Sequence, residues 1–257
     1  MLIHPKMTRP TILVTGGAKR IGSRIARRFA AAGWHVVIHY GQSREQAETL
    51  AAELPHAETV SCDLADTAAS LAMVEHLARR LEDWRMLVNS AAVFRFDDGT
   101  GIDREVFDEA MAVNARTPAM LTQAFLAHAQ AKGGRRVINL TDMKLANPNP
   151  DFFSYTMAKA ALAAATRIQA MATPSPADRV YALAPGAMLP SHDQHEAEHE
   201  TSGRMNLLQR LTDADELAHA ALFLSEGWLA SGETLYIDSG QHLLSQPRDV
   251  LYLARTL

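Results

Sequence analysis

The chain has 257 residues, of which 47% are hydrophobic and 21% are charged, as in an ordinary soluble globular protein. The net charge of -4 argues against broad nucleic-acid binding, which requires a basic surface. No apolar run is long enough to span a membrane, and the single cysteine, Cys62, excludes an internal disulfide. We therefore expect a cytoplasmic protein in a reducing compartment.

Apolar strand-like runs alternate with helical patterns along the whole chain. Strands are predicted within residues 11–16, 35–40, 57–64, 85–92, 135–142, 178–186 and 233–240. Helices are predicted at residues 20–33, 43–54, from after 64 to about 80, 104–112, 118–131, 152–171 and 213–225. This alternation predicts one α/β domain over residues 1–257, a doubly wound seven-stranded parallel sheet with helices on both faces.

Two segments lie outside this alternation. Residues 1–10 contain no signal-peptide core and are expected to form a loose lead-in. Residues 188–208 are polar and follow the end of a strand, where open α/β sheets bind ligands, which makes them a candidate substrate lid. His195 and His199 in this segment have the spacing of some zinc ligands, with His192 nearby. With no other sign of a metal enzyme, we expect a solvated segment and no metal.

The stretch TGGAKRIG, Thr15 to Gly22, lies between the first strand and the first helix. Glycines there allow the backbone to approach a pyrophosphate, and the helix N-terminus offers free N–H groups. The alternative is a tight turn without a ligand. The stretch resembles the TGxxxGxG turn of the short-chain dehydrogenases/reductases, with Arg20 in place of the middle glycine. That departure resembles the pteridine reductase branch, where the arginine faces the cofactor phosphates and the pterin.

The resemblance runs from Thr11 to about Leu244 and implies a Rossmann fold. It also implies cofactor contacts along the carboxyl ends of the strands. These residues are Gly16, Lys19, Arg20, Ile21, Tyr40, Ser43, Arg44, Asp63, Leu64, Asn89, Ser90, Ala91, Tyr155, Lys159, Pro185, Gly186 and Met188. The stretch LVNSAA departs from the family's N-N-A-G sequence at Ser90 and Ala92, which leaves the local loop geometry open.

The end of the second strand indicates which nicotinamide cofactor binds. NAD-binding domains usually carry an acid there, but HYGQSREQ has none before Glu45. Ser43 and Arg44 are able to donate hydrogen bonds to a 2′-phosphate, so we expect NADPH. The alternative for Ser43 is a helix N-cap. The resemblance places Asp63 against the adenine amino group.

Tyr155 and Lys159 form a Y-x-x-x-K pair at the start of a predicted helix. A phenol has an unperturbed pKa of about 10, and a nearby ammonium lowers it, so we expect Lys159 to tune Tyr155. In the family the same lysine holds the nicotinamide ribose. Asn114 matches the asparagine that supports this lysine through water; the alternative is a polar residue in or between two helices.

Asp142 stands thirteen residues before Tyr155, where most of the family has serine and pteridine reductases have aspartate. A carboxylate about 5 Å from the reacting bond changes the free energy of a charge on that bond by roughly 3 kcal/mol at an effective dielectric of about 20. This interaction destabilises the alkoxide formed when a C=O is reduced and stabilises a protonated C=N. Two alternatives stay open: a protonated Asp142 that donates like serine, or Thr141 or Ser154 in serine's place.

The resemblance gives a substrate-binding set of Arg20, Phe94, Asp142 and Tyr155, with Phe94 stacking a flat pterin. The catalytic set is Asp142, Tyr155, Lys159 and Asn114. We predict an NADPH-dependent reductase of the ring C=N of dihydrobiopterin, dihydromonapterin or dihydrofolate. The alternatives are a carbonyl reductase, for example of a 3-oxoacyl thioester, and a non-catalytic dinucleotide-binding sensor. The family implies a homotetramer, and the C-terminal extension 246–257 is expected to pack against a neighbouring subunit through Val250 to Leu253.

Overall fold

The computed structural model describes residues 9–191 and 194–256. Within these residues, seven parallel strands form one sheet in the order β3-β2-β1-β4-β5-β6-β7. The strands are β1 (Thr11–Thr15), β2 (His35–Tyr40), β3 (Ala57–Ser61), β4 (Trp84–Asn89), β5 (Arg136–Leu140), β6 (Arg179–Pro185) and β7 (Thr234–Ile237). The predicted single-domain, seven-stranded Rossmann-like fold is confirmed.

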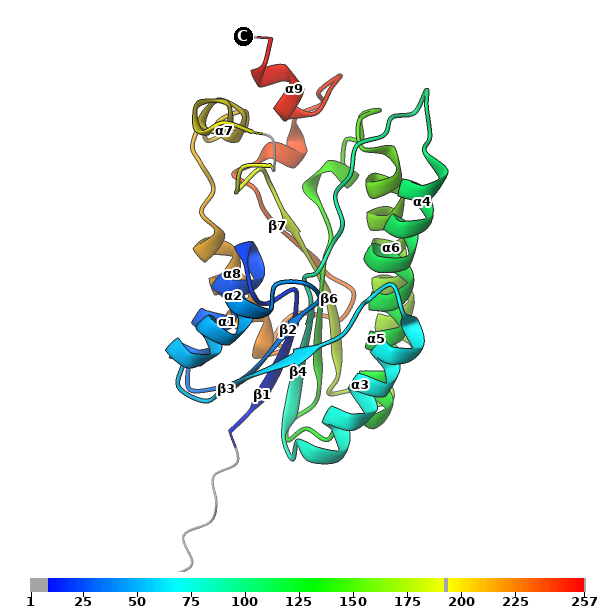
Figure 1. The fold of residues 1–257 in the computed structure, drawn as a ribbon, viewed down its shortest axis with the longest axis vertical. Coiled ribbons are helices and arrows are strands. Elements are labelled where there is room, and N and C mark those ends of the chain that lie inside the picture. Colours follow the sequence, from blue (N-terminus) through cyan, green and yellow to red (C-terminus); the bar gives the residue numbers. More distant parts are fainter. Residues whose placement is uncertain (1–8, 192–193, 257) are drawn as a thin grey trace, which may run out of the picture.

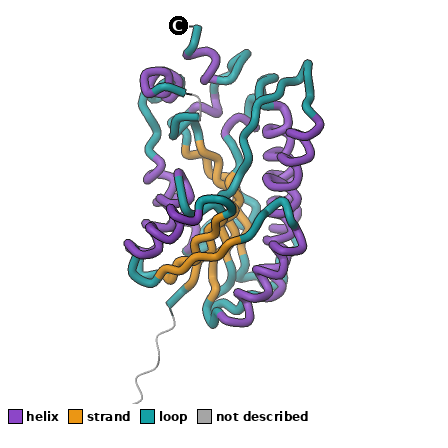
Figure 2. The backbone as a smooth tube through the Cα atoms, viewed as in Figure 1, coloured by secondary structure: helices purple, strands orange, loops and turns teal. Residues whose placement is uncertain are grey.

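Helices cover both faces of the sheet (Figure 1). One layer contains α1 (Arg20–Ala31), α2 (Arg44–Glu53) and α8 (Ala214–Ser225). The other contains α3 (Thr67–Arg80), α4 (Arg104–Met111), α5 (Thr117–His128) and α6 (Phe153–Met171). Figure 2 shows the strands enclosed between these layers, as expected for a parallel sheet whose strands are joined by crossover helices.

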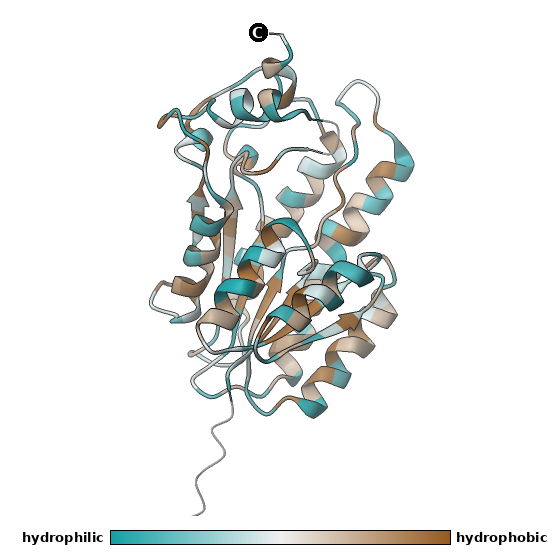
Figure 3. Ribbon diagram, turned by 60° about the vertical axis from the view of Figure 1, so that its left-hand side comes forward, coloured by the Kyte–Doolittle hydropathy of each residue, from teal (hydrophilic) through white to brown (hydrophobic). Residues whose placement is uncertain are grey.

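The central strands are apolar because both of their faces are covered. All five residues of β1 are buried. Successive side chains of β1 point to opposite faces, so Ile12 packs with the α1 and α8 layer and Leu13 packs with the α3 and α5 layer. Figure 3 shows the hydrophobic residues concentrated along these strands, with polar residues on the helices around them.

The chain reverses its direction across the sheet at β1. It runs from β1 outward through β2 and β3, and then returns to β4 on the other side of β1. Ligands of open α/β sheets bind at the carboxyl ends of the strands beside such a switch point. The carboxyl ends Thr15, Tyr40, Asn89, Leu140 and Pro185 therefore mark the edge where a functional site is expected.

The segment 188–208 is more ordered than predicted, because it contains the helix α7 (Glu196–Gly203). His195 stands at its N-cap and forms a capping box with Glu198, which favours this polar helix. His192 lies outside the described residues, as do residues 1–8 of the predicted lead-in.

The C-terminal extension forms the short helix α9 (Val250–Ala254), which lies beside α7 beyond the carboxyl ends of the strands (Figure 1). Val250 and Leu251 are buried within their own chain, whereas Tyr252 and Leu253 are partly exposed, and the predicted packing against a neighbouring subunit stays a prediction. Arg255 pairs with Glu198 of α7 at 3.3 Å. The extension is therefore part of the same wall of the molecule as α7.

Candidate active site

A cavity of about 410 Å³ opens at the carboxyl edge of the sheet. It gathers the turn after β1, the loop after β4, the end of β5, the start of α6 and the segment after β6. Of the predicted site residues, its lining includes Gly16, Lys19, Arg20, Ile21, Ser90, Ala91, Phe94, Asp142, Tyr155, Lys159, Pro185, Gly186 and Met188. Tyr40, Ser43, Arg44, Asp63, Leu64, Asn89 and Asn114 lie outside this lining.

The turn after β1 needs glycine for steric reasons. Gly16 has a positive φ of 62°, which L side chains adopt rarely. A Cβ at Gly22 would collide with the carbonyl oxygen of Gly16, so this glycine lets α1 pack tightly on the turn. The start of α1 therefore reaches the cavity with its backbone exposed to a ligand, as a phosphate-binding turn requires.

His39, which was not among the predicted site residues, fixes this turn. Its side chain is buried, and Nδ1 accepts the N–H of Gly16 at 3.2 Å. Nε2 therefore carries the proton and donates to the carbonyl of Cys62 at 3.0 Å. The backbone oxygen of His39 also accepts the N–H of Gly17 at 3.0 Å. Burial lowers the pKa of His39 to about 4, so it remains neutral.

Thr15 connects the same turn to the loop after β4. Its Oγ1 accepts the N–H groups of Ser90 at 3.0 Å and Ala91 at 3.1 Å. The loop is thus held in spite of its departure from the family sequence. The side chain of Asn89 points elsewhere, because its Nδ2 donates to Asn139 at 2.7 Å inside the core. A cofactor contact at Asn89 stays a prediction.

The ends of β2 and β3 carry the residues expected to meet the adenosine half of a cofactor. Ser43 occupies the N-cap position of α2, yet its side chain makes no capping hydrogen bond. Arg44 is exposed and donates to Glu48 at 2.7 Å. Asp63 uses Oδ1 to accept the N–H of Ala65 at 2.9 Å. Their cofactor roles stay predictions.

Asp142, Tyr155 and Lys159 form the polar centre of the cavity. The Tyr155 hydroxyl donates to Asp142 Oδ2 at 2.8 Å, and Asp142 Oδ1 accepts the backbone N–H of Lys144 at 2.8 Å. Lys159 Nζ donates to the carbonyl of Leu140 at 2.6 Å. The predicted juxtaposition of the aspartate with the Y-x-x-x-K pair is therefore present.

Burial dominates the titration of this centre. It raises the pKa of Asp142 and lowers that of Lys159 to about 8. The pKa of Tyr155 lies well above its usual value, through burial and then through the charge of Asp142. The lowering of the Tyr155 pKa that we expected from Lys159 is opposed by burial and by Asp142. Lys159 Nζ stays 5.7 Å from the centre of the ring.

Asn114 lies in a π-helical turn, η1 (Ala112–Arg116), which joins α4 to α5. Its Oδ1 accepts the N–H of Val93 at 2.8 Å, and its Nδ2 donates to the carbonyl of Val93 at 2.9 Å. Both polar ends of the side chain therefore hold the loop that leads to Phe94. Its support of Lys159 stays a prediction.

Phe94 stands beside Tyr155 within an aromatic cluster. Its ring stacks on Phe152 at 4.1 Å and meets the Tyr155 ring edge-on at 4.7 Å. Tyr252 of α9 stacks on Phe152 at 6.1 Å. A flat, hydrophobic wall therefore borders the polar centre, which suits a planar substrate.

Arg20 joins the glycine turn to the segment after β6. Its exposed side chain donates from Nη1 to the carbonyl of Pro190 at 2.9 Å.

Ser154 is fully buried and donates to Asp97 at 2.5 Å. Because its hydroxyl is committed there, Ser154 does not replace the usual catalytic serine. Thr141 is also buried.

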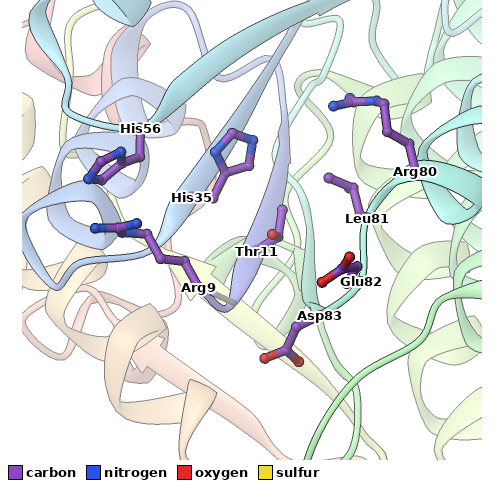
Figure 4. Close-up of a pocket in the computed structure, with 8 residues that line it drawn as sticks. All are labelled: Arg9, Thr11, His35, His56, Arg80, Leu81, Glu82 and Asp83. Carbon is purple, nitrogen blue, oxygen red and sulfur yellow. The ribbon is translucent and has the colours of Figure 1, made fainter. Parts of the chain in front are cut away.

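A second hollow lies at the opposite, amino end of the strands, between the starts of β1 and β2 and the end of α3 (Figure 4). It is wide open, and its charges neutralise one another: Glu58, beside it, accepts from His35 at 2.9 Å and from Arg80 at 2.8 Å. It shares no residue with the polar centre around Tyr155. We therefore assign the chemistry to the carboxyl edge.

None of the helices within the described residues has the length and apolar character needed to cross a membrane. In the same part of the chain, no group of three or more His, Cys, Asp or Glu side chains is placed to hold a metal ion.

Comparison with known proteins identifies the family. Residues 16–242 match the family model described as enoyl-(acyl carrier protein) reductase. The chain is 31% identical to pteridine reductase 1 of Leishmania tarentolae, over 92% of this chain and 97% of the relative. It is 30% identical to a putative ketoacyl reductase of the granaticin polyketide synthase of Streptomyces violaceoruber, over 91% and 97%.

Among solved structures, the chain resembles the FolM alternative dihydrofolate reductase 1 of Brucella canis, crystallised in complex with NADP. The two share 32% sequence identity with a TM-score of 0.86, over 94% of this chain and 97% of that one. Taken with the glycine turn, the Y-x-x-x-K pair and the sheet order, these matches show that the chain belongs to the short-chain dehydrogenase/reductase family.

Proposed function

We propose that the protein is an NADPH-dependent reductase of the ring C=N bond of a dihydropterin. The observation that carries this proposal is the direct hydrogen bond from Tyr155 to Asp142, in a cavity bordered by Phe94. Pteridine reductase 1 of Leishmania tarentolae and the Brucella FolM protein, which are similar over nearly their whole lengths, support it.

The residues present fit a nicotinamide dinucleotide. The turn at Gly16 and Gly22 leaves no room for side chains and brings the start of α1 to the cavity. The end of β2 has no acid to repel a 2′-phosphate, and the Ser43 hydroxyl is not used for capping. Ser43 and Arg44 would hold that phosphate, and Lys159 would hold the ribose. The bound cofactor supplies hydride to the substrate.

The protein's own contribution is to hold and move a proton. Burial raises the pKa of the Asp142 carboxyl, so Asp142 takes up a proton from solvent more readily than an exposed aspartate. Asp142 passes this proton to the ring nitrogen and is left as the carboxylate that accepts from Tyr155. The carboxylate stabilises the protonated nitrogen, which becomes neutral when the adjacent carbon receives hydride.

A carbonyl reductase is the competing function, and the Streptomyces relative is described as a putative ketoacyl reductase. Such an enzyme stabilises negative charge on the substrate oxygen as hydride arrives. Here the group bonded to Tyr155 is a carboxylate, which opposes that charge, and the Ser154 hydroxyl is bound to Asp97. These contacts favour C=N over C=O.

The test is NADPH oxidation by the wild-type protein with dihydrobiopterin, dihydromonapterin, dihydrofolate and an acetoacetyl thioester. We expect turnover of at least one dihydropterin with a kcat/KM well above that of the thioester. Turnover of the thioester alone would contradict the proposal, and NADPH binding without any turnover would support a sensor. From the family we also propose a cytoplasmic homotetramer, which sedimentation analysis tests.

A further inference from the structure

The cavity continues past Tyr155 into a smaller hollow between the α7 segment and the C-terminal extension. The two hollows share Phe94, Asp142 and Tyr155 in their linings. The far side of the smaller hollow is formed by Asp249, Val250 and Leu251. A substrate that reaches past the reacting bond therefore meets the C-terminal extension.

This wall is firmly anchored to its own chain. Arg248 Nε donates to both carboxylate oxygens of Asp151, at 2.9 and 2.8 Å. The backbone N–H of Asp249 donates to Asp151 Oδ2 at 2.7 Å. Lys144 Nζ, with 5% of the side chain exposed, donates to Asp249 Oδ2 at 3.2 Å and to the carbonyl of Asp151. The position of the Asp249 carboxylate is thus fixed.

The Asp249 carboxylate retains acceptor capacity toward the cavity. Oδ1 accepts the N–H of Leu251 at 3.1 Å and Oδ2 accepts from Lys144. Each carboxylate oxygen is able to accept more than one hydrogen bond. The side chain is 19% exposed, so a ligand is able to reach it.

The lining of the smaller hollow carries more acids than bases. Among the described residues that line it, Asp142 and Asp249 are acids and Lys144 is the single base. Lys144 already donates to Asp249 and to a backbone carbonyl. Asp249 also contributes to the raised pKa of Tyr155, so its charge is felt at the polar centre. This excess of acids over bases disfavours an anionic group in the hollow and favours hydroxyl and amino donors.

Building on the proposed function, we propose that Asp249 is a specificity-determining residue. Its carboxylate accepts hydrogen bonds from an uncharged, donor-rich end of the dihydropterin and disfavours a substrate whose tail carries carboxylates. Asp249 acts in substrate selection and not in the transfer of hydride or proton, which remains with Asp142 and Tyr155.

The test is the variant Asp249→Asn, which removes the charge but keeps a side chain that caps helices well. Its kcat/KM is measured with dihydrobiopterin, which has a hydroxylated neutral side chain, and with dihydrofolate, whose tail is anionic. We expect the ratio of kcat/KM for dihydrobiopterin to kcat/KM for dihydrofolate to fall at least tenfold, mainly through the KM values. Asp249→Glu should restore the preference for dihydrobiopterin. Calorimetric titration of biopterin and folate in the presence of NADP⁺ should show the same shift in Kd.

Asp103→Asn is the matched control, because Asp103 caps α4 in the same way and lies outside both hollows. It should leave the ratio unchanged. A ratio that moves less than threefold in Asp249→Asn, or moves equally in the control, overturns this inference while leaving dihydropterin reduction intact. Absence of dihydropterin turnover by the wild-type protein instead contradicts the proposed function and, with it, the inference.

Discussion

The half of the cavity at the glycine turn and the half at Asp249 differ in which part of the fold supports them. His39 ties Gly16 to Cys62 where β1, β2 and β3 end, and Thr15 holds the loop after β4. At the other half, Lys144 holds Asp249 of the C-terminal extension. The cofactor half is therefore built by neighbouring strands of the sheet, whereas the substrate half depends on the docked C-terminal extension. A substitution in one half should therefore leave ligand binding by the other half unchanged.

Tyr155→Phe is expected to have the largest effect. It removes the hydroxyl that donates to Asp142 but keeps the ring beside Phe94. Because general acid–base groups contribute about 10²–10⁴-fold, kcat should fall about 10³-fold. The NADPH Kd, measured by fluorescence titration, should stay within about threefold. Tyr181→Phe is the control, since Tyr181 donates to Leu229 outside the cavity; an equal loss there would contradict the role of Tyr155.

His39, which supports the cofactor half of the cavity, should make the free energy of unfolding depend on pH. Its folded pKa of about 4 lies below the ordinary value of 6.5, so the unfolded chain binds more protons between these pH values. The free energy of unfolding should therefore fall by about 3 kcal/mol from this residue as the pH drops from 7 to 4.

Urea unfolding of the wild type and of His39→Gln at both pH values isolates this contribution. Glutamine offers an acceptor and a donor but does not titrate. The wild type should lose about 3 kcal/mol more than the variant between pH 7 and pH 4. Equal losses would mean that His39 is not held neutral by the turn.

Truncation after Gln246 removes the wall of the substrate half. We expect the KM for a dihydropterin to rise roughly thirtyfold, which corresponds to about 2 kcal/mol. The NADPH Kd should not change, because the C-terminal extension lines the smaller hollow and not the cavity at the glycine turn. An unchanged KM for the dihydropterin would mean that the extension does not contribute to the substrate site.

Ser43→Ala is expected to have the smallest effect and to act only on the cofactor half. A lost hydrogen bond to a phosphate should raise the NADPH Kd about tenfold and leave the NADH Kd unchanged. Because the Ser43 side chain makes no capping bond, stability should change little. Ser225→Ala, at the end of α8, serves as the control. Equal weakening of NADH and NADPH would contradict a phosphate contact.

The fold could be read from the sequence because its strands are buried on both faces. Such strands appear as continuous apolar runs, and the helices between them carry the helical period. The elements that were missed lack these signals. The π-helical turn at Asn114 has no distinctive composition, and α7 is a polar helix stabilised by the His195 capping box and by a pair with Arg255 from the other end of the fold.

The site was predictable only where one local motif supplies the residues. The helical spacing of Tyr155 and Lys159 places both at the cavity, and the motif position of Asp142 places it on the phenol. The motif did not indicate that the side chain of Asn89 turns into the core. Asp249 carried no sequence signal, because its contact with Lys144 exists only after the chain has folded.

The variant Asp142→Ser tests whether the charge of Asp142 directs the enzyme to C=N bonds. Removing a charge worth roughly 3 kcal/mol at the reacting bond should lower kcat/KM for the dihydropterin by at least about 100-fold. The same change restores the hydroxyl usual in carbonyl reductases of the family, so turnover of an acetoacetyl thioester should not fall. Undiminished dihydropterin turnover by Asp142→Ser would show that the carboxylate of Asp142 does not select C=N bonds.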